Sequence, residues 1–139
     1  MRKLFSIFSM VLLYVTISFG QAAVEIPFTV EDSNGSSRVL TFGLDAAATG
    51  GIDPALGESE LPPFPPTGIF EARFVSNAQA TLGEGSLKDI RNALAFPFSG
   101  TYTHQIKYQT SDPSPATITV SWNLPAEIIA GSVIRDLLG

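Results

Sequence analysis

The chain has 139 residues, with 8 basic and 13 acidic side chains and no cysteine. An acidic surface argues against nucleic acid and anionic membranes as partners, because both carry negative charge themselves. The lack of cysteine excludes disulfides and a lipid-modified N-terminal cysteine, so the core or a bound ion must hold the fold together.

The N-terminal residues 1–22 predict a cleaved signal peptide. Arg2 and Lys3 form a basic start, and an apolar stretch then runs from Leu4 to Phe19. That stretch is short for a membrane span, which needs about 20 apolar residues, and small residues follow it at once. The alternative is a short membrane anchor. Removing the leader leaves six basic residues against 13 acidic ones, a formal charge of −7, and no stable membrane span. We therefore expect a secreted protein of the periplasm, cell surface or extracellular space.

The rest of the chain, residues 23–139, predicts a single domain, because about 116 residues suffice for one core but not for two. Apolar residues alternate with polar ones from Val24 to Val30, which indicates a strand with one buried face. Pro27 lacks an N–H, so we expect this strand at a sheet edge, or Pro27 itself unpaired. Residues 32–37 are typical of a turn, and residues 38–44 predict the returning strand of a hairpin.

Further strands follow towards the C-terminus. Residues 69–75 predict one strand, whereas Ser86 to Asp89 resemble a helix start, with a strand as the alternative. Residues 101–109 and 117–122 predict a second hairpin around the turn at 112–115, and residues 132–138 a last strand. The alternation assigns four aromatic side chains to the core: Phe28, Phe70, Phe74 and Trp122. This pattern predicts an all-β fold, an antiparallel β-sandwich of immunoglobulin-like or jelly-roll-like type.

One long Gly/Pro-rich loop, residues 45–67, interrupts the strands and contains five of the ten prolines. Calcium prefers six to eight oxygen ligands on flexible backbone, and Asp45, Asp53 and Glu58 are candidate ligands for it. The spacing does not match an EF-hand loop. The favoured alternative is that these acids cap turns, or that Asp45 or Asp53 forms an ion pair with Arg73 on the next strand. No other cofactor is expected.

Catalytic motifs are lacking in the sequence. The single histidine, His104, falls within a strand pattern, and there is no Gly-x-Ser-x-Gly elbow or zinc-ligand cluster. We expect the protein not to be an enzyme. Tyr102 and Tyr108 are candidate ligand-facing aromatics, because tyrosine combines an apolar ring with a polar tip, although core packing is the alternative for each of them.

The loop and the strands around it resemble a known module. The matching segments are Phe42 to Asp45, Ala48-Thr49, Gly51 to Asp53, Gly57-Glu58, Leu61 to Pro63, Phe70 to Phe74, Ile118 to Trp122, Leu124-Pro125 and Ile134 to Asp136. They are similar to a β-sandwich module of exported bacterial proteins that commonly end in a type IX secretion sorting domain. The resemblance covers nearly all of the chain after the leader, and it implies no catalytic residues.

The resemblance implies a non-catalytic structural or binding module, extracellular or on the cell surface, with other surface domains or polysaccharide as partners. The alternative is a carbohydrate-binding module, assisted by calcium. The sorting domain that should follow is missing, since the sequence stops at Gly139. This predicts either a fragment of a longer protein, which we favour, or a short form without a sorting signal.

Overall fold

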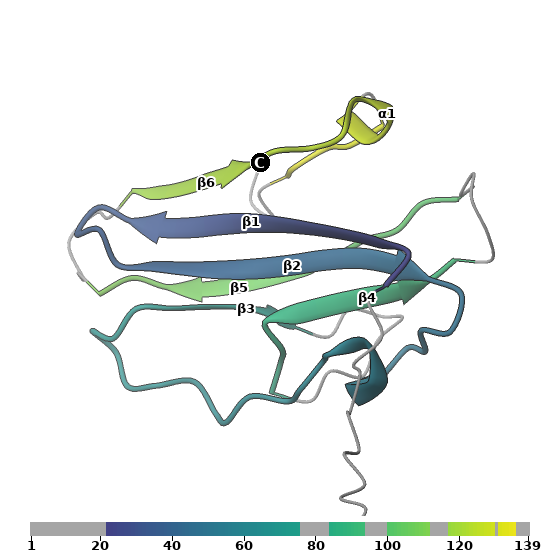
Figure 1. The fold of residues 1–139 in the computed structure, drawn as a ribbon. Coiled ribbons are helices and arrows are strands. Elements are labelled where there is room, and N and C mark those ends of the chain that lie inside the picture. The colour runs from purple at the N-terminus through teal and green to yellow at the C-terminus, as the bar shows by residue number, and fades with distance from the viewer. Residues whose placement is uncertain (1–21, 76–83, 94–99, 112–116, 130, 136–139) are drawn as a thin grey trace, which may run out of the picture.

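The computed structural model describes residues 22–75, 84–93, 100–111, 117–129 and 131–135, and the predicted signal peptide lies almost entirely outside these ranges. The described chain is mostly strands, in two sheets, as the sequence predicts for an all-β fold (Figure 1). The elements are β1 Val24–Asp32, β2 Ser37–Asp45, the short 3-10 helix η1 Pro54–Leu56, β3 Glu71–Val75, β4 Lys88–Asn92, β5 Gln105–Gln109, β6 Ile118–Trp122 and α1 Ala126–Ile129. No helix within these ranges is long and apolar enough to cross a membrane.

The first hairpin forms as predicted, with β1 and β2 antiparallel from Val24 opposite Leu44 to Glu31 opposite Ser37. However, β1 is not an edge strand, because it lies between β2 and β6. Pro27 is tolerated there for a local reason. Its partner Thr41 donates its N–H away from β1, to the Leu87 carbonyl, so the Pro27–Thr41 pair exchanges no ladder bond. The missing N–H would face β6, whose pairing with β1 begins only at Phe28.

The prediction of a purely antiparallel fold is wrong at β4. This strand pairs parallel to β2, with Thr41 opposite Lys88 and Asp45 opposite Asn92, so the sheet with the order β4-β2-β1-β6 is mixed. Parallel neighbours require a long connection between them, and residues 46–87, with β3 among them, supply it. Of the two alternatives for the segment after Ser86, the strand is therefore the one that forms.

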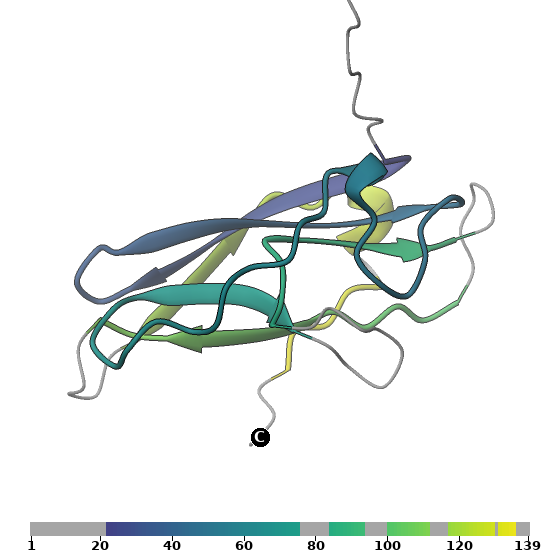
Figure 2. The ribbon, with the colours of Figure 1, turned by 90° about the horizontal axis from the view of Figure 1, so that it is seen from below.

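The predicted second hairpin is also wrong. β5 pairs with β3 in the second, two-stranded sheet, whereas β6 pairs antiparallel with β1 in the first sheet. Figure 2 shows β1 and β2 in one layer and β3 and β5 in the other. The turn predicted at 112–115 lies outside the described residues. Of the predicted last strand, residues 132–135 form no strand, and the remainder lies outside the description.

The main core lies between the two sheets. Phe28, Val30 and Leu40 from the first sheet pack with Ala72 and Phe74 from the second, and all five are buried. The ring of Phe28 meets that of Phe74 edge-on, with centroids 5.7 Å apart, a favourable aromatic geometry. The alternation therefore assigns Phe28 and Phe74 to the core correctly, and the half-buried Phe70 packs against the same core.

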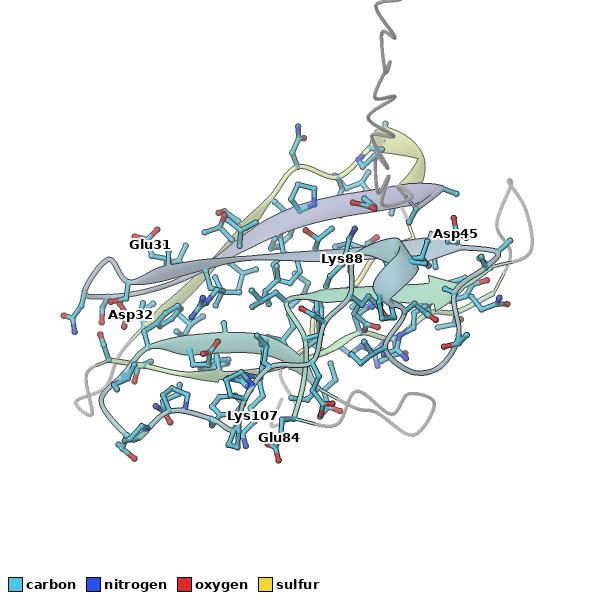
Figure 3. The ribbon with its side chains drawn as sticks, turned by 60° about the horizontal axis from the view of Figure 1, so that its bottom comes forward. Glu31, Asp32, Asp45, Glu84, Lys88 and Lys107 are labelled. Atoms are coloured by element: carbon cyan, nitrogen blue, oxygen red, sulfur yellow. The ribbon has the colours of Figure 1, made fainter. Side chains whose placement is uncertain are left out.

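A second link between the sheets is the buried carboxylate of Asp32, at the end of β1. It accepts hydrogen bonds from the backbone N–H groups of Asn34 and Ser36 in the turn, and from the backbone and hydroxyl of Ser111 after β5, at 2.5–3.0 Å. The Ser111 hydroxyl is the main cause that lowers the pKa of Asp32. Asp32 and Asp45 lie at opposite ends of the long hairpin (Figure 3), so β5 is held beside β1 at the Asp32 end.

Candidate functional site

The first half of the long loop folds back over the outer face of β4. Ala48 and Leu56 from the loop, Ala22 from the N-terminal side and Ile90 from β4 form a second, small buried cluster. Beside this cluster, Gly43 of β2 leaves no room for a side chain, because a Cβ there would lie 2.0 Å from the Val24 carbonyl oxygen of β1 and 2.8 Å from Ile90 Cδ1. The loop segment is thus packed against the sheet.

A salt bridge closes this small cluster on one side. Lys88 Nζ lies 2.7 Å from Glu25 Oε1 and donates to the Leu56 carbonyl at 2.8 Å. Burial alone would raise the pKa of Glu25, but hydrogen bonds from Lys88 and from the Ala22 N–H outweigh it, and the pKa is lowered. The pair therefore joins β1, η1 and β4 in one ionised contact.

The predicted calcium ligands Asp45 and Asp53 each hold a turn. Asp45 accepts the backbone N–H of Ala47 at 2.7 Å and that of Ala23 at 3.0 Å. Asp53 accepts the N–H of Thr49 at 2.6 Å and its hydroxyl at 3.0 Å. Such side-chain bonds to nearby backbone are the usual role of Asp in turns, and they agree with the alternative that the acids cap turns.

Glu58, the third predicted ligand, is buried and bridges the loop to β4. One oxygen accepts the Ile90 N–H at 2.5 Å, and the other accepts the Asp53 N–H at 2.7 Å. Burial raises the pKa of Glu58, and the negative charges of Asp53 and Asp89 add to this effect against the two hydrogen bonds. Within the described residues, no group of three acidic, histidine or cysteine side chains is arranged to hold a metal ion.

The predicted ion pair of Arg73 with Asp45 or Asp53 is wrong, because Arg73 pairs with Glu71. Its guanidinium lies 3.2 Å from Glu71 Oε2, with only 1% of the side chain exposed. It also donates to the carbonyls of Pro62 and Glu84, and its charge lies 4.2 Å from the centre of the Phe64 ring. Asp45 and Asp53 instead form their hydrogen bonds in the first half of the loop and with Ala23. Arg73 anchors the proline-rich half to β3.

A buried polar cluster, which the sequence does not predict, lies on the inner face of β4. Asp89 Oδ2 is 2.8 Å from both Arg91 Nη2 and His104 Nδ1. The His104 ring packs against Phe42 and Phe74, at centroid distances of 5.1 and 5.8 Å. An Asp-oriented histidine is two-thirds of a hydrolytic triad, but the contacts of this cluster include no serine or cysteine nucleophile among the described residues. We interpret it as a buried polar network of the core, centred on the Asp89 carboxylate.

Two aromatic side chains are exposed although each belongs to an inner face. Tyr108 is 53% exposed and lies opposite Ala72, and Trp122 is 44% exposed and lies opposite Phe28. The predicted core position of Trp122 is therefore wrong, whereas Ile118 and Val120 on the same strand do pack against the core. Tyr102, the other predicted ligand-facing ring, is half-buried near Gly100.

The sequence contains one signal for the missed partner of Arg73. Glu71 stands two residues before it, and residues i and i+2 of a strand share a face.

Comparison of the chain with known proteins finds no matching family model, no matching curated protein and no matching solved structure.

Proposed function

We propose that this chain is a non-catalytic structural or binding module of a secreted bacterial protein, built as a β-sandwich around the two sheets. The observation that carries the proposal is that the polar side chains of the candidate site bind groups within the fold itself. Asp45, Asp53 and Glu58 bind backbone N–H groups, Arg73 anchors the loop and Asp89 satisfies His104. The exposed apolar side chains, among them Tyr108 and Trp122, would then form the surface that contacts a partner.

The proposal includes export through the predicted leader at residues 1–22, and on the resemblance a place in a protein of the type IX secretion route. Expression of the full chain in a bacterial host, with fractionation and intact-mass measurement, tests export directly. We expect a periplasmic or secreted product that has lost the leader by cleavage near Gly20 to Ala23. An uncleaved product retained in the membrane would favour the anchor instead.

The alternative is a carbohydrate-binding module, and the exposure of Tyr108 and Trp122 favours it, because exposed rings stack on sugar faces. Pull-down on a panel of insoluble polysaccharides, with and without calcium, is the test. Binding that is lost in Tyr108→Ala or Trp122→Ala but kept in Val39→Ala would establish this alternative, since Val39 is an exposed apolar residue on another face. A hydrolase would require an activity that disappears in His104→Ala.

A further inference from the structure

The two edges of the four-stranded sheet differ in how they are protected. On β4, the Ile90 N–H is bound by Glu58, and the Lys88 N–H is bound by the Ser86 hydroxyl at 3.2 Å. Residues 84–88 also connect β4 to the second sheet, where Ser86 bridges Phe74. The β4 edge is therefore covered by the protein's own chain.

The opposite edge is β6, the outermost strand of its sheet in the described chain (Figure 1, top). No strand of the described chain other than β1 pairs with it. The backbone groups at this edge follow from the register. Thr41 points its N–H towards β4, and alternation across the sheet then directs Thr119 and Ser121 towards β1. The N–H and C=O groups of Ile118, Val120 and Trp122 consequently face outward.

This edge also lacks the devices that usually prevent strand pairing. Natural edge strands carry a charge, a proline or a bulge, whereas β6 is Ile118-Thr119-Val120-Ser121-Trp122 and contains none of these. On its inner face, Ile118 and Val120 are half-buried and Trp122 is largely exposed. An unprotected edge beside a partly exposed apolar row favours the addition of another strand.

We propose that the added strand is β6 of a second copy of this chain, paired antiparallel about a two-fold axis at Val120. The three residues whose N–H and C=O groups face outward are placed symmetrically about Val120. Ile118 of each copy therefore lies opposite Trp122 of the other. Thr119 of each copy meets Ser121 of the other. The edge is thus self-complementary, as an interface related by a two-fold axis requires, and each Trp122 gains an apolar neighbour across the pair.

Charge favours this strand over the rest of the surface as the contact between copies. The domain carries −7 after leader removal, which opposes most contacts between two copies, but β6 itself has no charge. Two acids of the adjacent strand lie opposite β6. Asp32, opposite Ile118, is buried and accepts hydrogen bonds from Ser111, whereas Glu31, opposite Thr119, is exposed. Glu31 side chains of the two copies would be about three strand spacings apart, roughly 14 Å, beyond the screening length of about 8 Å in physiological salt.

A five-residue strand from each copy buries less than the interface of a permanent dimer, so we expect a weak, concentration-dependent association. Cysteine cross-linking tests its register, because the natural chain has no cysteine. Mixing Thr119→Cys with Ser121→Cys places the two cysteines at a non-hydrogen-bonded pair of the proposed register. Their Cα atoms would be about 4.5 Å apart, within the range of a disulfide. Thr119→Cys alone leaves them on a diagonal, about 7–8 Å apart.

We expect the mixed sample to form disulfide-linked dimers several-fold faster than either variant alone. It should also cross-link faster than Thr119→Cys mixed with Val39→Cys, the matched control on the same sheet face but on an interior strand. Equal rates in all samples would overturn the proposed register. The comparison measures contact between copies only, so its outcome is independent of any polysaccharide or surface partner in the proposed function.

Sedimentation of the uncross-linked protein gives the second test. The natural chain should gain average mass with concentration up to about 1 mM, the range of weak association. Thr119→Lys combined with Ser121→Lys sets like charges opposite each other across the pair and should remain monomeric. Val39→Lys adds a charge away from the edge and should associate like the natural chain. A natural chain that remains monomeric throughout would overturn the proposal, as would a lysine pair that associates unchanged.

Discussion

Replacement of Arg73 by leucine tests how far one buried guanidinium holds the long loop. The change removes the donor to the carbonyls of Pro62 and Glu84 and the nearer cation beside Glu71. Breaking a buried ion pair costs about 3–5 kcal/mol. Arg38 remains 3.4 Å from the same Glu71 oxygen, so the lower end applies, about 3 kcal/mol. For a domain of this size, that loss lowers Tm by about 12 °C.

Arg38→Leu is the matched control, because both arginines contact Oε2 of Glu71. The Arg38 side chain is 39% exposed, against 1% for Arg73, and exposed pairs contribute only about 0–1 kcal/mol. Thermal melts of the two variants give the comparison, and limited proteolysis shows whether residues 60–66 detach first. A Tm for Arg73→Leu no lower than that for Arg38→Leu would refute the reasoning.

Burial raises the pKa of Glu58, so the folded state binds its proton more tightly, and stability falls as pH rises from about 4.5 through the folded pKa. The Glu58→Gln variant should lose less stability than the natural chain over this pH range. Curves of Tm against pH that run parallel for the two proteins would contradict this prediction. Gly43→Ala should cost about 3 kcal/mol or more through the clash of its Cβ with the Val24 carbonyl. Gly35→Ala, with a positive φ but open space, should cost only about 1 kcal/mol, measured by denaturant midpoints. Millimolar calcium should leave Tm unchanged, because the loop carboxylates bind backbone N–H groups; a rise would show that the ion recruits them.

Alternation identifies the strands whose inner faces are apolar, and β1, β2 and β3 follow it. It does not detect β4, because the inner face of β4 carries Asp89 and Arg91. These side chains are buried only because they pair with each other and with His104, from a distant part of the chain. Local periodicity contains no sign of such a pairing.

Strand partners are likewise not encoded locally. The closeness of β5 and β6 in sequence predicts that they pair. Instead, Ile106 of β5 lies opposite Phe74, and Val120 of β6 lies opposite Val30. Each strand extends the apolar face of a different sheet. The candidate site shows the same limit: acids in a Gly/Pro loop suit both calcium and turn capping, and only the positions of the N–H groups distinguish the two.

The pairing of β6 with β1 has a consequence for folding kinetics. Val30 and Val120 are partners although about 90 residues separate them, whereas the β1–β2 hairpin closes over a short turn. Pairing between residues far apart in sequence forms slowly, because a long loop must close first. The hairpin should therefore form early, and β6 should join it late. Until then, the β1 edge that awaits β6 is exposed to other chains. Pro27, with no N–H to offer, and Glu31, with its charge, lie along that edge and discourage misassembly.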